Sequence, residues 1–186
     1  MLKITSGIYK GKQLISPEKN TTRATKSIVK ASLFNTLQFD LPGANFVEVF
    51  GGSGSVGLEA LSRGAKKSFF IERDKKAYGI LIKNTKLIDA QNRKCFLGDS
   101  FHTFEKLLSH INSDTYFYFD PPFEFRDNMN DIYEKTVALI QKCPKEYTKM
   151  IIVEHNSSVK FEDITGLELL KSKKFGKTTL TYYKID

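Results

Sequence analysis

The sequence predicts an α/β fold with a seven-stranded, mostly parallel sheet, because strand-like and helix-like segments alternate along most of the chain. Apolar, strand-like runs occur at 45–50, 67–71, 93–97, 115–119 and 149–154. Helix-like segments lie between them, at 55–63, 74–88, 101–110 and 128–142. Two further strand-like runs, at 166–175 and 177–185, are joined by Phe175-Gly176-Lys177 and predict a terminal antiparallel hairpin. We therefore expect a sheet with helices on both faces that this hairpin closes.

Length and composition favour one globular domain. The 186 residues can bury a sizeable core but are too few for two domains. Hydrophobic residues make up 40% and charged residues 27%, a mixture typical of globular proteins. No apolar run approaches the ~18 residues of a membrane helix, and the first residues lack the apolar stretch of a signal peptide. We expect a cytoplasmic protein without a membrane partner, and a monomer.

Cysteine and histidine spacing gives no metal signal. Cys95 and Cys143 lie far apart and form no CxxC pair, so neither a disulfide nor a zinc site is expected. His102, His110 and His155 show no ligand spacing and no nucleophile partner. We predict no metal site.

Residues 1–40 form a basic extension ahead of the main domain, which we place at 41–186. The extension carries seven lysines and arginines against two acidic residues, so it holds a net +5 of the +8 of the whole chain. Segments 2–5 and 12–15 are expected to pair as a small hairpin. A helix is expected at 25–38, with Thr25 as its N-cap. The extension is either a solvated basic face or an arm that binds phosphate groups.

A glycine-rich loop follows the first predicted strand and opens a helix. Its pattern is GxGxxG, and glycine there lets the backbone approach a ligand closely. The cofactor contacts expected from this loop are Phe50, Gly52, Ser53, Gly54 and Gly57. Glu48, just before the loop, favours S-adenosylmethionine (SAM) over a nicotinamide cofactor, because a carboxylate suits an ammonium group and not a pyrophosphate. The alternative interpretation is a tight turn without a ligand.

Acidic residues also end the next two strands. Glu72, with Arg73 after it, is placed to accept hydrogen bonds from ribose hydroxyls. Asp99, followed by Ser100, could accept from an adenine amine. Each acid alone could be a solvated loop residue. Because the carboxyl ends of parallel strands meet at one edge of a sheet, we expect all three acids to face one cofactor crevice.

The fourth strand runs into Asp120-Pro121-Pro122-Phe123, the most specific motif of the chain. Two prolines cannot continue a central strand, so they fix a stiff turn and leave carbonyl oxygens outside the ladder. Two acceptors, the Asp120 carboxylate and a carbonyl, could hold the N–H groups of an amine conjugated to a base, while Phe123 stacks on the base. We predict these four residues, with Asp120 also near the cofactor, to be catalytic. The alternative is that the prolines only terminate a buried strand.

A parallel sheet that ends in a hairpin is typical of the Rossmann-like class I methyltransferases, whereas a nicotinamide-dependent oxidoreductase would continue with another crossover helix. With these motifs the chain resembles the RsmD family of bacterial small-subunit ribosomal RNA guanine-N2 methyltransferases over nearly its whole length. The segments that carry the resemblance are Gly7, Gly11-Lys12, Arg23-Ala24-Thr25, Leu33-Phe34-Asn35-Thr36-Leu37, the 48–54 loop, Gly57-Leu58-Glu59-Ala60-Leu61-Ser62-Arg63-Gly64-Ala65, Glu72, Gly98-Asp99, Asp120-Pro121-Pro122-Phe123 and Phe175-Gly176-Lys177-Thr178.

The resemblance implies a SAM-dependent enzyme that methylates a guanine N2 amine in 16S ribosomal RNA, within the small ribosomal subunit. In that picture the basic extension binds the RNA. The residues expected to contact RNA are Lys10, Lys12, Arg23, Thr25, Lys26 and Lys30. The chain departs from the usual family pattern at Ala24, where the family has proline, at Ala31, where it has glutamate, and at Gly51, where it has alanine. The first two departures bear on the choice of RNA rather than on the chemistry.

Other functions remain compatible with the motifs. An adenine-N6 methyltransferase on RNA or DNA would use the same Asp-Pro-Pro-Phe turn, although DNA enzymes usually carry an added recognition domain. A protein-glutamine methyltransferase usually begins that motif with asparagine. A non-catalytic RNA-binding assembly factor could retain the whole fold.

Overall fold

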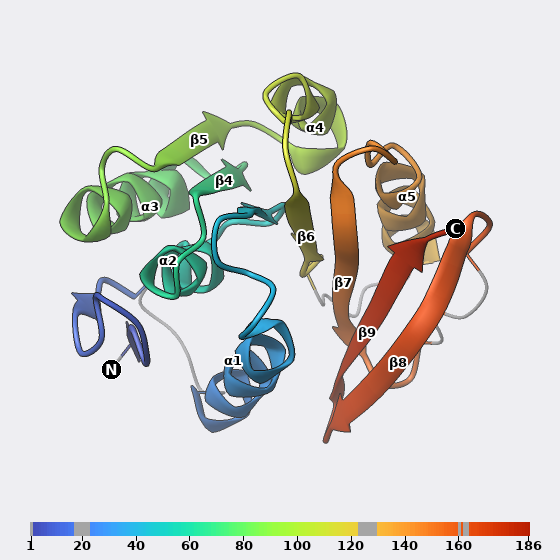
Figure 1. Ribbon diagram of the computed structural model, residues 1–186, viewed down its shortest axis with the longest axis horizontal. Coiled ribbons are helices and arrows are strands. Elements are labelled where there is room, and N and C mark those ends of the chain that lie inside the picture. Colours follow the sequence, from blue (N-terminus) through green and yellow to red (C-terminus); the bar gives the residue numbers. More distant parts are fainter. Residues whose placement is uncertain (1, 17–22, 123–129, 160, 162–163) are drawn as a thin grey trace.

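The computed structural model describes residues 2–16, 23–122, 130–159, 161 and 164–186 (Figure 1). Its central sheet has seven strands in the order β5-β4-β3-β6-β7-β9-β8. The strands are β3 (Asn45–Glu48), β4 (Lys67–Glu72), β5 (Arg93–Leu97), β6 (Thr115–Phe119), β7 (Thr148–Asn156), β8 (Leu167–Phe175) and β9 (Thr178–Ile185). The five strands from β3 to β7 are parallel, and β9 pairs antiparallel with both β7 and β8. The predicted fold class is confirmed, including the terminal hairpin.

Among the described residues, five helices flank the strands. They are α1 (Arg23–Leu37), α2 (Ser55–Ser62), α3 (Lys75–Ile88), α4 (Ser100–Leu108) and α5 (Asn130–Ile140). Residues 128–129 of the helix expected at 128–142 lie outside the described residues. Asp74 is the N-cap of α3, and its side chain accepts the Ala77 N–H at 2.8 Å. Asp99 is the N-cap of α4, and its side chain accepts the Phe101 N–H at 2.8 Å.

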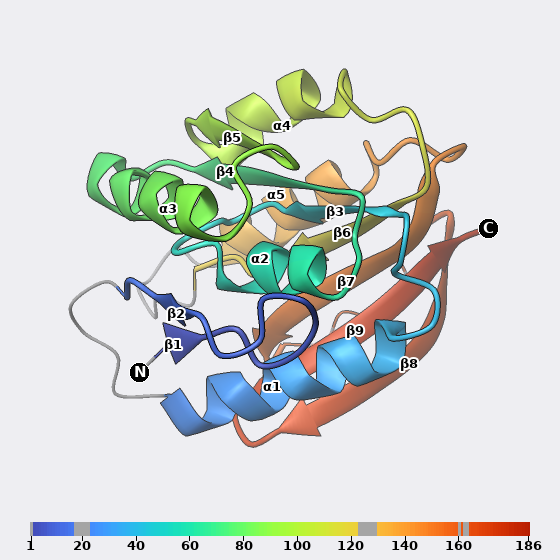
Figure 2. The same cartoon turned by 60° about the vertical axis from the view of Figure 1, so that its left-hand side comes forward.

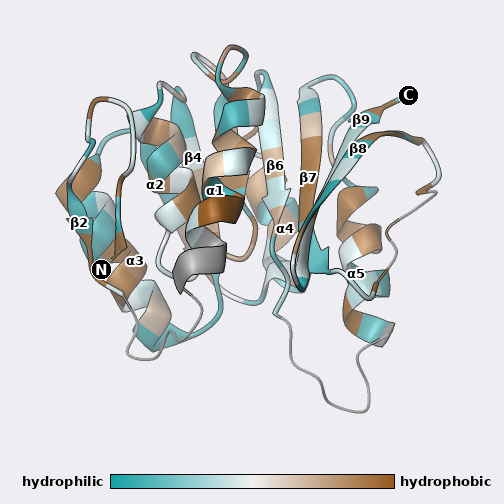
Figure 3. Ribbon diagram, turned by 90° about the horizontal axis from the view of Figure 1, so that it is seen from below, coloured by the Kyte–Doolittle hydropathy of each residue, from teal (hydrophilic) through white to brown (hydrophobic). Residues whose placement is uncertain are grey.

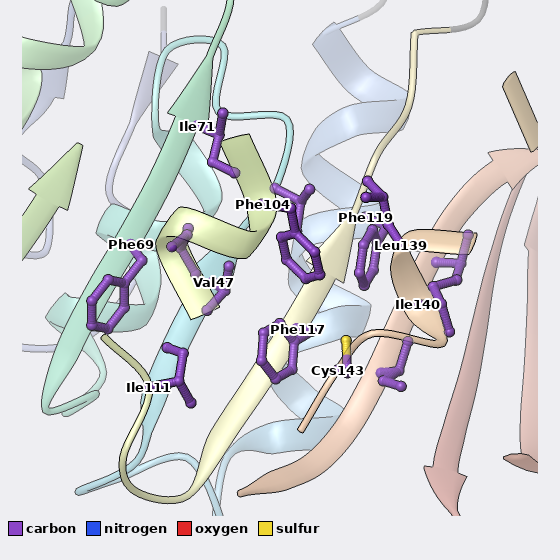
Figure 4. Packing of buried hydrophobic residues seen from close by; sticks show 14 of the residues in the cluster. Val47, Phe69, Ile71, Phe104, Ile111, Phe117, Phe119, Leu139, Ile140 and Cys143 are labelled. Carbon is purple, nitrogen blue, oxygen red and sulfur yellow. The ribbon is translucent and has the colours of Figure 1, made fainter. Parts of the chain in front are cut away.

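Side-chain alternation along the strands divides the helices between the two faces of the sheet. On β4, Phe69 and Ile71 share one cluster with Phe104 of α4, whereas Phe70 between them packs with Leu81 of α3. The face toward α4 and α5 is dense with aromatic rings (Figure 4). Phe104 meets Phe117 and Phe119 edge-on, with ring centroids 6.0 and 5.8 Å apart. These contacts fix the carboxyl end of β6, where the candidate site begins.

Helix α1 covers the other face of the sheet (Figure 2). Val29, Leu33 and Leu37 are buried, as their i, i+4 spacing predicts. The helix begins at Arg23, so the expectation that Thr25 is the N-cap is wrong: Thr25 already lies in the first turn.

The N-terminal hairpin is shorter than expected, with β1 at Leu2–Lys3 and β2 at Gln13–Leu14. It packs on the main domain rather than projecting from it, since Ile4 and Leu14 share a buried cluster with residues of α2, β4 and α3. Gly7 in its loop has a φ of +82°, and a Cβ there would lie 1.7 Å from the Ser62 carbonyl oxygen. Only glycine allows this close approach of the loop to α2.

The last two strands differ in character. β7 is apolar along its middle, whereas the edge strand β8 is largely polar and exposed (Figure 3). Lys171, Lys173 and Lys174 lie on that edge, where lysines discourage pairing with another sheet. None of the described helices is long and apolar enough to cross a membrane.

Candidate active site

Two adjoining cavities lie at the carboxyl ends of the parallel strands. One has a volume of about 230 Å³ and the other about 260 Å³, and both are lined by Phe50, Gly52 and Asp120. The first also reaches Glu48 and Ser53, and the second reaches the ends of β4 and β5. Ligands of open α/β sheets bind at this edge, so the position agrees with the sequence-based site.

The glycine loop is held against β3 by Glu48. The Glu48 carboxylate accepts the Gly57 N–H at 2.8 Å. A Cβ at Gly57 would lie 2.4 Å from the Phe70 ring and 3.2 Å from this carboxylate, so any side chain would displace both. Gly54 has a φ of +77° at the start of α2, and a Cβ there would lie 2.5 Å from Leu81. The spacing of the glycines thus serves packing as well as access to a ligand.

Glu48 is buried, with 4% of its surface exposed, yet it lines the first cavity. Burial raises the pKa of Glu48 to about 8, although the N–H groups of Gly57 and Val56 and the Lys30 ammonium act in the opposite direction. A carboxyl group held in this way would ionise readily when a cation is placed beside it.

Glu72, at the end of β4, also binds the glycine loop. One of its oxygens accepts the Gly52 N–H at 2.7 Å, and the other accepts the Asp74 N–H at 2.7 Å. Gly52 has a φ of +51°, and a Cβ there would meet nothing within 4 Å. The space beside this glycine is therefore open, as a backbone cradle for a ligand requires.

The wall of the second cavity includes Asp99 and Ser100, which come after β5, and Arg73, which comes after β4. Asp99 is half-exposed and caps α4. The Ser100 hydroxyl is buried and donates to the Val49 carbonyl at 2.6 Å, so it joins α4 to β3. Its hydroxyl hydrogen is thus used within the protein.

The proline turn places Asp120 where the two cavities meet. Asp120 and Pro122 are half-buried, and Pro121 is buried. Phe123, expected to stack on a base, and Phe125 lie outside the described residues.

Among the expected RNA contacts, Lys30 proves to be an internal residue. Its ammonium lies 3.1 Å from the Glu59 carboxylate, and the two side chains are 9% and 0% exposed. Glu59 also accepts hydrogen bonds from Thr5 and pairs with Arg63 at 2.9 Å. Burial raises the pKa of Glu59, but Lys30, Thr5 and Arg63 together hold it below its ordinary value. The prediction that Lys30 meets RNA phosphates is therefore corrected: it anchors the extension.

The other expected RNA contacts divide into two groups. Lys10 and Lys12 are exposed in the loop between β1 and β2. For Arg23, Thr25 and Lys26 the structure gives the helical backbone but not the side chains, so their RNA contacts stay predictions.

Three polar residues at the site were not predicted from the sequence patterns. Asn84 of α3 is fully buried, exchanges two hydrogen bonds with the Ile15 backbone and donates to the Ser53 carbonyl at 2.9 Å, which ties the extension to the glycine loop. Tyr118 and Glu154 line the first cavity, and the Tyr118 hydroxyl donates to Glu154. Tyr118 belongs to the apolar run at 115–119, and its pairing with Glu154 depends on the register of β6 and β7, which no local pattern reveals.

The residues present fit SAM. Glu48 offers a carboxylate for an ammonium, the open space at Gly52 admits a ligand to the backbone, and Glu72 lies in the second cavity, where a ribose would fit. Asp99 and Arg73 lie further along the same wall. Among the described residues, no group of three or more His, Cys, Asp and Glu side chains could hold a metal ion.

Comparisons with known proteins show the family and the fold of the chain. The family model described as Conserved hypothetical protein 95 matches residues 2–184. Ribosomal RNA small subunit methyltransferase D of Haemophilus influenzae is 29% identical over 187 residues, covering 98% of this chain and 93% of that protein. A solved structure from Escherichia coli has a TM-score of 0.78 at 25% identity and covers 100% of this chain and 98% of that chain. Another chain, solved as a complex with SAH, shows the same fold, with a TM-score of 0.65, 14% identity, and 87% of this chain and 49% of that chain covered. The chain therefore belongs to the family described as Conserved hypothetical protein 95, the RsmD family that its motifs resemble.

Proposed function

We propose that this protein transfers a methyl group from SAM to the exocyclic N2 amine of a guanine in small-subunit (16S) ribosomal RNA. The observation that carries the proposal is the place of Asp120, which lines both cavities at the end of β6. SAM would extend from Glu48 in the first cavity to Glu72 and Asp99 in the second, and its methyl group and the base would meet at the Asp120 carboxylate. Relatives named ribosomal RNA small subunit methyltransferase D support ribosomal RNA as the substrate.

SAM, when bound, would supply an electrophilic methyl group on a sulfonium that leaves readily. Glu48 would hold the ammonium of the methionine end, and Glu72 the ribose hydroxyls. Asp99 would face the adenine amine. The protein's contribution is then position and electrostatics rather than covalent chemistry.

Asp120 acts on the attacking nitrogen. A guanine amine is a poor nucleophile, because its lone pair is delocalised into the ring. Its N–H groups would donate to the Asp120 carboxylate and to a carbonyl of the proline turn, which aims the lone pair at the methyl group. The carboxylate also stabilises the positive charge that develops on this nitrogen. Proton loss follows transfer, so no strong base is needed.

The extension would bring the RNA to this edge. Leu2, Lys3 and Ser16 border the first cavity, and the exposed Lys10 and Lys12 belong to the same hairpin. We place Arg23, Thr25 and Lys26 among the RNA contacts as well. The working form is a monomer in the cytoplasm that acts on the small ribosomal subunit.

The test is transfer of labelled methyl from SAM to small subunits that lack their native methylation, with the product nucleoside identified by mass spectrometry. We expect N2-methylguanosine at one site. N6-methyladenosine would keep the chemistry and overturn the substrate, and SAM binding without transfer to any RNA would favour an assembly factor. Asp120→Ala should abolish transfer and leave SAM affinity largely intact. Equal loss of both would remove Asp120 from the role assigned to it.

A further inference from the structure

Glu154 is a second carboxylate on the wall of the first cavity, beside the proline turn. The last paired residues of β6 and β7 are Phe119 and Val153, so Asp120 and Glu154 follow them on adjacent parallel strands. Alternation along the strands puts Asp120 and Glu154 on the sheet face that carries Tyr118. All three line the same cavity.

Glu154 lies on the cavity wall with little of its surface exposed. Glu154 is 6% exposed and Tyr118 is 2% exposed. The Tyr118 hydroxyl donates to one Glu154 oxygen, which fixes the orientation of the carboxylate. The pKa of Tyr118 is raised well above its ordinary value, first by burial and then by Glu154, Asp120 and Glu48, so these carboxylates lie within electrostatic reach of one hydroxyl.

Burying a carboxylate is costly unless hydrogen-bond donors surround it. A carboxylate only accepts hydrogen bonds and has about four acceptor sites, and both Asp120 and Glu154 line this cavity. The cavity wall therefore presents acceptors from Asp120 and Glu154 side by side, and a ligand that brings two adjacent donors would match them.

Guanine and adenine differ at this point. Guanine carries the N1–H donor next to its 2-amino group, so its edge offers adjacent donors. Adenine carries an N1 lone pair next to its 6-amino group, and that lone pair would face a carboxylate oxygen. We propose that Glu154 determines base specificity by accepting the guanine N1–H while Asp120 faces the 2-amino group. This inference rests on the proposed function, and Tyr118 is a positioning residue that orients Glu154.

The first experiment needs no variant. Small subunits are reconstituted with either guanine or 2-aminopurine at the methylated position. 2-Aminopurine keeps the 2-amino group but has an N1 lone pair in place of N1–H. We expect the wild-type protein to methylate 2-aminopurine about 10- to 100-fold more slowly than guanine, the range of one hydrogen bond to a charged group. Equal rates would overturn the inference.

The second experiment tests whether a substitution at Glu154 shifts the preference from guanine toward 2-aminopurine. In Glu154→Gln the side-chain amide can donate to the N1 of 2-aminopurine. We expect transfer to guanine to fall about 10- to 100-fold, and the ratio of the two rates to shift toward 2-aminopurine by a similar factor. SAM affinity should stay unchanged. Equal loss on both substrates would mean that Glu154 is only structural, and loss of SAM affinity would assign it to the cofactor; either result refutes the inference.

Two further measurements complete the test. The fluorescence of 2-aminopurine rises when the base leaves its stack, and titration should show tighter binding by Glu154→Gln than by the wild type, independently of methyl transfer. Tyr118→Phe keeps the carboxylate but removes the hydrogen bond that orients it, so it should narrow the preference for guanine without reversing it. A reversed preference in that variant would refute the assignment to Glu154. Formation of N6-methyladenosine by the wild type would overturn the proposed function itself, whereas N2-methylguanosine with an unchanged substrate ratio would overturn only this inference.

Discussion

Replacing Glu48 by glutamine should change how the stability of the protein depends on pH. The pKa of Glu48 is raised from an ordinary 4.5 to about 8, mainly by burial. Between these two values the folded protein holds a proton that the unfolded chain has lost. The free energy of unfolding therefore falls as the pH rises through this window. Glutamine cannot ionise, and its oxygen can still accept the Gly57 N–H, so Glu48→Gln should lack this dependence.

The size of the effect follows from the shift. One pKa unit corresponds to about 1.4 kcal/mol, so between pH 5 and pH 8 Glu48 should lower the free energy of unfolding by roughly 3 to 4 kcal/mol. Lys30 and Glu72 are the charged groups that act on the pKa of Glu48, and both are present in the variant. The difference between wild type and Glu48→Gln therefore isolates Glu48. Urea unfolding at several pH values in this range measures it. A difference that stays constant with pH, or that grows in favour of the wild type, would refute the reasoning.

Because of the same carboxyl group, SAM binding should release a proton. At pH 6.5 Glu48 is protonated in the free protein, and an ammonium beside it would lower its pKa, so binding should release about one proton. Calorimetry in two buffers with different ionisation heats counts this proton, and Glu48→Gln should release none. Equal proton release by both proteins would show that the ammonium lies elsewhere.

Two other substitutions test the packing of the loop and the function of the extension. Gly57→Ala would put a Cβ 2.4 Å from the Phe70 ring, so urea unfolding should show a loss of about 1 to 3 kcal/mol together with weaker SAM binding; unchanged stability would mean that the loop can move aside. Replacing Lys10 and Lys12 by alanine should weaken RNA binding and lower the slope of log K against log salt by about one to two units, whereas Lys173→Ala on β8 should leave the slope unchanged. An identical slope for the double variant would remove these lysines from the phosphate contacts.

The sequence predicted the parts of the site that strand ends determine. Glu48 lies near the end of one apolar run, and Glu72, Asp99 and Asp120 come after three others. Because parallel strands bring their carboxyl ends to one edge, the convergence of these acids needed no knowledge of distant contacts. Lys30 was assigned wrongly for the opposite reason. Its charge counts toward a basic segment, but its partner Glu59 belongs to another helix, and only the packing of α1 beside α2 turns it inward.

Asn84 and Glu154 show a second limit. Asn84 lies inside an amphipathic helix pattern, where a polar residue is ordinarily solvated, yet it is fully buried because it bonds the Ile15 backbone and the glycine loop at once. Glu154 lies within an apolar strand, and its role depends on which residue of β6 it faces. That pairing is set by sheet register, which many contacts determine together and no short motif encodes.

The extension at 1–40 and the main domain also prove to be inseparable at the site. Lys30 of α1 pairs with Glu59 of α2, donates to the Lys3 carbonyl and lines the first cavity beside Glu48. The residues that border this cavity thus come from the hairpin, from α1 and from the sheet. A deletion of the hairpin would remove part of the cavity wall, expose the cluster around Ile4 and leave Glu59 buried without the Thr5 hydrogen bonds. The extension must therefore be tested by surface substitutions such as those at Lys10 and Lys12, because truncation would damage the cofactor site and the RNA contacts at the same time.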